Sequence, residues 1–224
     1  MRANKLLGRS QVPRLRLLPY GRYRYVDQSD PVLFYYWPIV GTMYRRRVEL
    51  CLAELRGGDR ILEVGFGSGT AFLNLHDSYR EIYGLDLTAP VAEVTSLFSS
   101  IGIDTVLQNG NVLGMPYPDG FFDAVLLISI LEHLKVDELE PAFMEVRRVL
   151  KSGGQVVYGV PVERPLMVLA FWLLGHSIHE HHHSTERDVS AAAESVLGRV
   201  GLTQMPAVLP GLGSVYQIGH FVRQ

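Results

Sequence analysis

The stretch that decides the fold, residues 61–70, reads Ile-Leu-Glu-Val-Gly-Phe-Gly-Ser-Gly-Thr. Its apolar residues favour a short parallel strand that is buried on both faces, and the glycines that follow are typical of a strand-to-helix turn. Such a turn leaves backbone N–H groups at the start of a helix, where they can face a ligand. Dinucleotide sites, methyl-donor sites and plain tight turns all use this arrangement, so residues 61–70 alone do not choose among them.

Two carboxylates make a ligand-binding role more specific. Glu63 stands inside the predicted strand, and because burying an unpaired charge is costly we expect it to have a partner. Asp86 ends the next apolar run, about twenty residues after the first glycine, where a carboxylate that binds a ribose belongs. The structural alternative for Asp86 is a simple cap at a strand end.

Five ordered motifs between residues 45 and 160 resemble those of the class I S-adenosylmethionine-dependent methyltransferases, in particular the type 11-like domain. They are the acidic glycine loop, Gly84-Leu85-Asp86-Leu87, the segment 110–125, Ser129-Ile130-Leu131-Glu132-His133-Leu134 and Val149-Leu150-Lys151-Ser152-Gly153-Gly154. A nicotinamide site typically carries Gly-x-Gly-x-x-Gly. The spacing here is Gly-x-Gly-x-Gly with an acidic residue two positions ahead, which favours the methyl donor and disfavours a dehydrogenase.

The resemblance implies an α/β fold with a Rossmann-like, mostly parallel seven-stranded sheet, helices on both faces and an antiparallel C-terminal hairpin. The residues themselves predict parallel strands, because apolar runs alternate with helical patterns along the chain. We expect strands at 61–64, 81–87, 103–108, 122–130 and 155–160, helices at 70–78, 90–101 and 137–150, and hairpin strands at 202–209 and 214–222.

The resemblance also assigns the cofactor, S-adenosylmethionine, to particular residues. Glu63 would hold loop amides and the ammonium end of the methionine, and Asp86 would accept hydrogen bonds from both ribose hydroxyls. Asn111 departs from the family, which commonly has Asp there; its amide oxygen can still accept from the adenine amino group, but without the charge. The full predicted set is Glu63, Gly65, Gly67, Gly69, Asp86, Leu87, Asn111, Val112 and Ser129.

A general base is needed only if the acceptor must lose a proton. His133 is the candidate, because an imidazole titrates near neutral pH and this residue follows the predicted fourth strand. The alternative is a structural histidine at a strand-to-helix turn.

The chain is predicted to consist of a basic N-terminal arm, residues 1–29, and a methyltransferase domain, residues 30–224. The first 26 residues hold seven basic and no acidic side chains. We expect this arm to be extended or disordered, either as a solvated tail or in contact with an anionic surface such as a membrane. The net charge of -2 gives no case for nucleic acid, and the lone Cys51 suits the reducing cytoplasm.

The acceptor should meet the chain outside these motifs. Residues 30–55 read as two helices separated at Pro38, and Tyr36 and Trp37 would either cap an acceptor pocket or pack on the sheet; the run 45–47 of three arginines reads as a solvated face. An insertion at about 161–190, with Trp172 and His179, is the predicted acceptor lid.

The apolar run 166–174 of this insertion is too short to span a bilayer. It is either a buried helix or a helix that contacts a membrane surface or an apolar acceptor. Five histidines at 176–183 could bind a metal, serve the acceptor or have no chemical role; contiguous imidazoles cannot all face one ion, so no metal is assigned. A capping box at Thr185 and Asp188 starts a helix that should end near Gly201.

The sequence thus predicts methyl transfer to a small-molecule or lipid-like acceptor by a cytoplasmic protein, with peripheral membrane contact as an open alternative. The rival function is a non-catalytic module of methyltransferase fold that binds a membrane or a partner. The intact Glu63, Asp86 and glycines argue against that rival.

Overall fold

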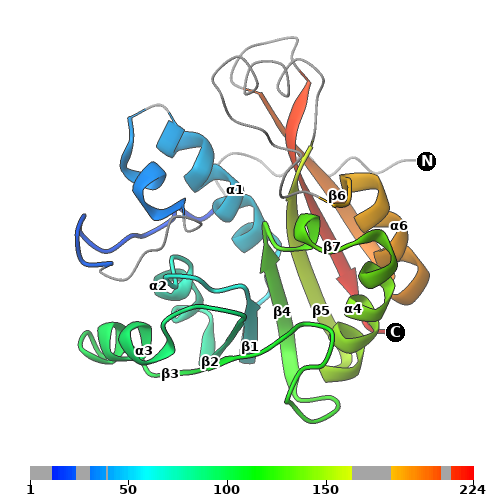
Figure 1. Ribbon diagram of the computed structural model, residues 1–224, viewed down its shortest axis with the longest axis horizontal. Coiled ribbons are helices and arrows are strands. Elements are labelled where there is room, and N and C mark those ends of the chain that lie inside the picture. Colours follow the sequence, from blue (N-terminus) through cyan, green and yellow to red (C-terminus); the bar gives the residue numbers. More distant parts are fainter. Residues whose placement is uncertain (1–11, 24–30, 39, 163–182, 208–212) are drawn as a thin grey trace.

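A computed structural model describes residues 12–23, 31–38, 40–162, 183–207 and 213–224. Its centre is a seven-stranded sheet with the order β3-β2-β1-β4-β5-β7-β6 (Figure 1). Neighbours among β1 to β5 pair in parallel, whereas β7 is antiparallel to both β5 and β6. The predicted fold class is confirmed. The strands are β1 (Gly58–Val64), β2 (Tyr79–Asp86), β3 (Thr105–Asn109), β4 (Phe122–Ile128), β5 (Leu150–Pro161), β6 (Gly198–Pro206) and β7 (Ser214–Val222).

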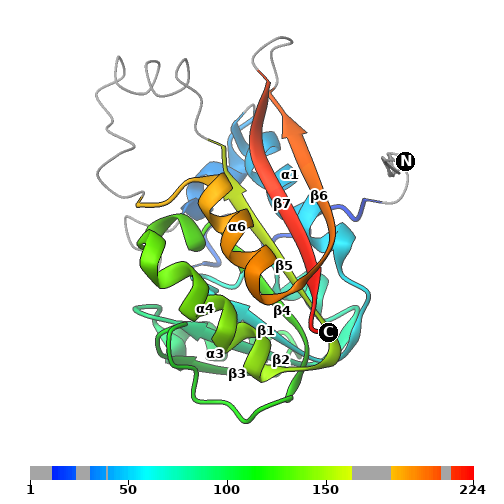
Figure 2. The same cartoon turned by 90° about the vertical axis from the view of Figure 1, so that its right-hand side faces the viewer.

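Helices cover both faces of the sheet. One face carries α1 (Val40–Glu54), α2 (Phe72–Leu75) and α3 (Val91–Ser99), and the other carries α4 (Val136–Val149) and α6 (Glu186–Val196). Figure 2 shows α4 and α6 in front of the strands and α1 behind them. Two short 3-10 helices, η2 (Pro31–Tyr36) and η3 (Leu131–His133), complete the described elements.

Each face of the sheet has its own hydrophobic core, because neighbouring residues of a strand point to opposite sides. Ile61 and Ala124 belong to the core under α1 to α3, whereas Leu62 and Val125 belong to the core under α4 and α6. Central strands that are buried on both faces read as continuous apolar runs, as the sequence of β1 and β4 does.

The C-terminal hairpin begins earlier than the sequence predicts. The helix expected to end near Gly201 ends at Val196, and β6 starts at Gly198 instead of at residue 202. The capping box at the start of α6 is present: Thr185 N donates to Asp188 Oδ2 at 2.9 Å. Residues 198–206 pair with β7 over their length, and this long-range ladder ends the helix.

Part of the predicted N-terminal arm packs on the domain. Leu15 and Leu18 are buried, and Leu15 N donates to Glu49 Oε1 of α1 at 3.0 Å. Arg16 forms an ion pair with Asp77 at 2.7 Å. Residues 12–23 are therefore not the solvated tail that their charge suggests, because apolar side chains between the basic ones anchor them. The boundary at residue 29 remains a prediction.

No helix within the described ranges is long and apolar enough to cross a membrane. Within the same ranges, no group of three or more His, Cys, Asp and Glu side chains is placed to hold a metal ion. Most of the predicted lid lies outside the described residues.

Candidate functional site

The predicted cofactor residues lie at the carboxyl ends of four neighbouring strands, with Asn111 and Val112 after β3. The glycine loop follows β1, Asp86 ends β2, and Ser129 follows β4. From β1 the chain crosses to β2 on one side, whereas from β4 it crosses to β5 on the other (Figure 1). In open α/β sheets the crevice at such a reversal of strand order is where ligands bind.

Glu63 is a buried carboxylate one residue from the end of β1. It lies between Gly84 of β2 and Leu126 of β4, and the side chain is 4% exposed. Its Oε2 atom has no hydrogen-bond partner among the described residues. Burial, and after it the negative charge of Asp86, raises the pKa of Glu63 to about 8. The partner that the sequence leads us to expect is therefore not supplied by the described protein atoms.

The glycine loop needs its glycines for both conformation and packing. Gly65, Gly67 and Gly69 have positive φ angles of 73°, 49° and 72°. A Cβ atom on Gly65 would lie 2.0 Å from the Cδ1 atom of Ile130, and one on Gly69 would lie 2.6 Å from the Phe72 ring. The backbone of this loop is thus fixed closely against its surroundings.

Asp86 ties the loop to the end of β2. Its Oδ2 atom accepts from Gly67 N at 3.0 Å, and its Oδ1 atom accepts from the N–H groups of Thr88 and Ala89 at 2.9 Å each. A loop amide thus binds a strand-end carboxylate, but the acceptor is Asp86 and not Glu63. A carboxylate has about four lone-pair sites, and Asp86 uses three of them as a strand-end cap, which leaves one on Oδ2 for a ribose hydroxyl. Leu87, beside it, is 68% exposed.

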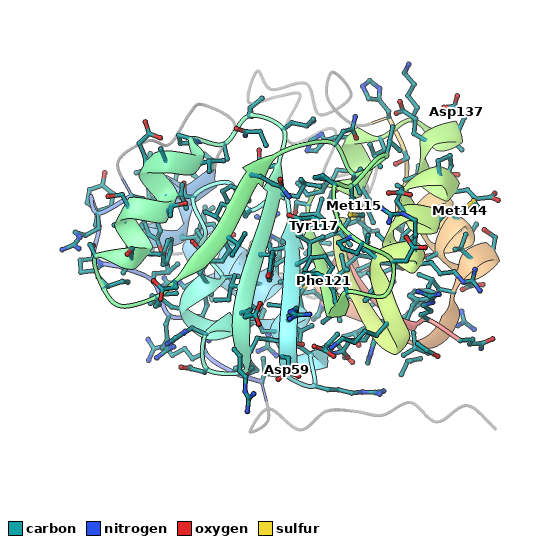
Figure 3. All side chains as sticks on the ribbon, turned by 90° about the horizontal axis from the view of Figure 1, so that it is seen from below. Asp59, Met115, Tyr117, Phe121, Asp137 and Met144 are labelled. Carbon is teal, nitrogen blue, oxygen red and sulfur yellow. The ribbon has the colours of Figure 1, made fainter. Side chains whose placement is uncertain are left out.

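The loop after β3 supplies the predicted adenine side. Asn111 is exposed, and its Oδ1 atom accepts from Leu113 N at 3.0 Å. The side chain of Val112 is buried in the core. Met115 and Tyr117 of the same loop lie between the strands and α4 (Figure 3), where Arg148 donates to both of their carbonyl oxygens. These bonds hold the loop in place from the α4 side.

We expect Asn111→Asp to be tolerated and to bind S-adenosylmethionine at least as tightly as the wild type. Aspartate keeps the acceptor for Leu113 N and adds charge toward an amino group, while an exposed substitution of this kind changes stability by about 0.5 kcal/mol or less. Calorimetric titration and thermal unfolding of both proteins measure this. A large loss of affinity would show that Asn111 does not stand in for the acid of the family.

Ser129 has a strained backbone at the end of β4. Its φ of 55° is the one positive value among the described non-glycine residues. Ser129 N donates to Gly159 O at 2.8 Å, and its Oγ atom lies 2.9 Å from the hydroxyl of Tyr216. Strain held in this way is common at functional sites.

His133 lies where the sequence places it, exposed at the end of η3, and its backbone N–H donates to Ile130 O at 3.1 Å. Its role as a base remains a prediction. Of the predicted acceptor residues, Tyr36 uses its hydroxyl to donate to Leu18 O, while Trp37 is 46% exposed. Trp172 and His179 lie outside the described residues.

The burial of two charged residues in this region is not predicted from the sequence. Arg47 is not on a solvated face: its Nε atom is buried, and its guanidinium lies 3.9 Å from the centre of the Tyr44 ring and 5.2 Å from that of Tyr216. The helical period gives the signal, because Arg47 is three residues after Tyr44 and four before the buried Cys51. Glu132 of η3 is 4% exposed, and burial raises its pKa to about 8.

A cavity of about 480 Å³ adjoins the glycine loop on its outer side. Ser68 of the loop, Arg22, Tyr23 and residues of α3 line it. Neither Glu63 nor Asp86 is among its lining residues.

Residues 62–158 match a protein family described as a methyltransferase domain. An uncharacterized methyltransferase of Bacillus subtilis (strain 168) is 33% identical over 105 residues, which make up 46% of this chain and 41% of that protein. A ubiquinone/menaquinone biosynthesis C-methyltransferase of Stenotrophomonas maltophilia (strain R551-3) is 28% identical over 120 residues, 49% of this chain and 45% of that protein. The chain spans about half the length of the curated relatives it matches.

The fold has close counterparts among solved structures. Geranyl diphosphate C-methyltransferase from Streptomyces coelicolor A3(2), in complex with Mg²⁺, geranyl diphosphate and S-adenosyl-L-homocysteine, has a TM-score of 0.65 at 17% identity, over 83% of this chain and 80% of that one. At this identity the likeness concerns the fold alone. The matched domain, together with the position of the motifs on the sheet, confirms the resemblance to the class I S-adenosylmethionine-dependent methyltransferases over residues 62–158.

Proposed function

We propose that this chain binds S-adenosylmethionine at the carboxyl ends of β1 and β2 and transfers its methyl group to a small-molecule or lipid-like acceptor. The observation that carries the proposal is the buried carboxylate of Glu63, whose Oε2 atom has no partner among the described residues. It stands beside a glycine loop that Asp86 fixes in place. An ammonium group is the kind of ligand that would offset the cost of this buried carboxylate.

The residues present fit the cofactor. Glu63 would hold the ammonium end of the methionine, and Asp86 would accept from the ribose hydroxyls, one at the lone pair left on Oδ2 and one in exchange for a present backbone donor. Gly67 allows a close approach because it lacks a Cβ atom, whereas the missing Cβ atom of Gly65 makes room for Ile130. Asn111 and the backbone N–H of Val112 would meet the adenine.

The cofactor supplies a methyl group that its sulfonium has already activated, so the protein has little covalent chemistry to perform. The tasks left to this chain are to hold an acceptor in line, to exclude water and, for some acceptors, to remove a proton. The fixed glycine loop and the strained Ser129 at the end of β4 suit the first task, because they leave little freedom at this edge of the sheet.

The small-molecule class of acceptor is supported by the names of related proteins, which mention ubiquinone/menaquinone biosynthesis and geranyl diphosphate. A lipid-like acceptor and peripheral contact with an anionic membrane are the finer parts of the proposal, and they rest on the apolar run 166–174 and the basic N-terminus. A non-catalytic module would not need to keep the buried Glu63, the ribose-binding candidate Asp86 and the loop glycines together.

Calorimetric titration with S-adenosylmethionine and with S-adenosylhomocysteine tests this function. We expect micromolar binding to the wild type, and we expect Asp86→Ala to weaken it by about 1.5–3 kcal/mol, roughly ten- to more than a hundredfold. Asp137→Ala, an exposed acid at the start of α4 (Figure 3), is the matched control and should bind like the wild type. Absence of binding to the wild type, or equal binding to Asp86→Ala, would remove the cofactor assignment.

A further inference from the structure

A cluster of polar side chains lies under α1, next to the carboxyl end of β4. It consists of Arg47 of α1, Ser129 after β4, Glu132 of η3 and Tyr216 of β7, and we call it the Arg47–Glu132 cluster. The Arg47 guanidinium faces the rings of Tyr44 and Tyr216, and the Tyr216 hydroxyl lies 2.9 Å from Ser129 Oγ. Arg47, Ser129 and Tyr216 thus come together, and Glu132 is close enough for its charge to act on Arg47 and Tyr216.

Two atoms of this cluster are buried without a hydrogen-bond partner among the described residues, Arg47 Nε and Glu132 Oε2. Among the described residues, Arg47 and Glu132 do not form an ion pair, because no guanidinium nitrogen lies within 4 Å of a carboxylate oxygen. A pair with a purely structural role would be expected to satisfy these atoms, because buried polar groups nearly always find partners. The open donor and the open acceptor indicate that the cluster receives a ligand.

The cluster adjoins the glycine loop. Ile130 stands between Ser129 and Glu132 in the chain, and its side chain lies where a Cβ atom on Gly65 would be. The strained Ser129 is held by Tyr216 on one side and by Gly159 O on the other. A ligand at the cluster would therefore be next to a methyl donor bound at the loop.

We infer that the Arg47–Glu132 cluster is the acceptor site, and that it takes phenols or enols, acceptors that enter neutral and become anionic when they react. Glu132 receives the acceptor's proton, and Arg47, held over the rings of Tyr44 and Tyr216, stabilises the resulting anion. This inference rests on the proposed function and names the acceptor class for it.

The charges of the cluster select this class. An amine that arrives as an ammonium would be repelled by Arg47, and a carboxylate acceptor would find Arg47 but would have no use for a base. A phenol or an enol uses both groups. The acceptor's proton passes to the Glu132 carboxylate, and the electron pair left on oxygen or carbon forms the bond to the methyl carbon. The electron pair of the broken carbon–sulfur bond stays on sulfur, so the positive sulfonium and the negative carboxylate both end neutral.

The base form of Glu132 increases as the pH rises. Burial raises its pKa to about 8, and its own backbone hydrogen bond and the charge of Arg47 partly offset this effect. Besides Arg47 of α1, the titratable group that faces it is Tyr216 of β7, whose pKa burial raises well above its ordinary value. His133, the next residue in the chain, is exposed. We expect methyl transfer to phenols to become faster as the pH rises through about 8.

The first test measures binding and needs no turnover. The probe is 4-nitrophenol, whose anion absorbs visible light, titrated with pH in the presence of protein saturated with S-adenosylhomocysteine. The wild type should lower the pH at which the bound probe ionises, and Arg47→Met should abolish this shift. Arg46→Met, the neighbouring arginine of α1 in an ion pair with Glu49, should keep it. Arg47→Lys, which keeps the charge, replaces Arg47→Met if that variant does not fold and should retain part of the shift.

The second test measures S-adenosylhomocysteine formation with a panel of phenols, 1,3-diketones, primary amines and carboxylic acids. Glu132→Gln should lower kcat for phenols and diketones by roughly 100- to 10,000-fold and leave KM within a few-fold, whereas Glu140→Gln on the exposed side of α4 should change neither. Turnover with amines or carboxylic acids alone, or an unshifted probe in the wild type, would overturn the inference. Failure of the wild type to bind S-adenosylhomocysteine would instead overturn the proposed function.

Discussion

Replacing Glu63 by glutamine is expected to stabilise the cofactor-free protein above pH 8 and, at the same time, to weaken its binding of S-adenosylmethionine. The pKa of Glu63 is raised to about 8 in the fold, against about 4.3 for an unfolded glutamate. As the pH rises, the unfolded chain therefore loses this proton first, and the folded state loses stability between about pH 4.3 and pH 8. At about 1.4 kcal/mol for each pKa unit, the loss amounts to at most about 5 kcal/mol.

Urea unfolding at pH 5 and pH 9 measures this effect. The difference in the free energy of unfolding between Glu63→Gln and the wild type should be small at pH 5 and reach about 2–4 kcal/mol in favour of the variant at pH 9. Part of the pH dependence should remain, because burial also raises the pKa of Glu132 to about 8. Glu81→Gln, an exposed acid on β2, is the control and should not show this gain.

The opposite signs of the two effects are informative. Replacing a carboxylate that stabilises the fold lowers the stability of the free protein, whereas replacing one that is kept for a ligand raises it. A Glu63→Gln protein that is less stable than the wild type at both pH values, with unchanged cofactor binding, would contradict the role we give to Glu63.

The second large effect is expected at Gly65. Gly65→Ala places a Cβ atom 2.0 Å from Ile130 Cδ1 at a φ of 73°. The left-handed backbone costs about 1–2 kcal/mol for alanine and the overpacking about 1–3 kcal/mol more, so the free energy of unfolding should fall by roughly 2–5 kcal/mol. Denaturant unfolding of the cofactor-free protein is the measurement.

Gly102→Ala is the matched control for Gly65→Ala. Gly102 has a similar φ of 81°, but nothing lies within 4 Å of a Cβ atom there. The free energy of unfolding of Gly102→Ala should therefore fall only by the part that comes from the left-handed backbone. Ile130→Ala removes the Cδ1 and Cγ1 atoms that meet the new methyl group, and a double-mutant cycle with Gly65→Ala should recover the contact part of the loss. Equal destabilisation by the two glycine substitutions would show that Ile130 does not restrict the loop.

Local pattern was enough to predict most of the sheet and the position of the loop. The strand at 214–222 has the predicted bounds, and the first strand, the glycines and Asp86 lie at the predicted edge, because apolar runs and glycine spacing act within a few residues of the chain. The end of α6 was mispredicted, since it depends on pairing between β6 and β7.

What the sequence could not predict is which distant group each polar side chain meets. Gly67 N donates to Asp86, and Arg47 turns inward toward Tyr216, only because the fold brings them together. A run of three arginines is typical of a solvated face, and only the helical spacing of Arg47 from Tyr44 and Cys51 indicates that this side chain is buried. Glu132 is buried by elements far away in the chain, which no local pattern records.

The crystal structure of the chain with S-adenosylhomocysteine tests the central claim, a methyl-donor site at the carboxyl ends of β1 and β2, most directly. We predict that both ribose hydroxyls lie within hydrogen-bonding distance of the Asp86 carboxylate, that the ammonium group lies next to Glu63, and that the adenine lies beside Asn111. Electron density for the ligand in the cavity between Tyr23 and α3, or none at the strand ends under saturating ligand, would contradict it.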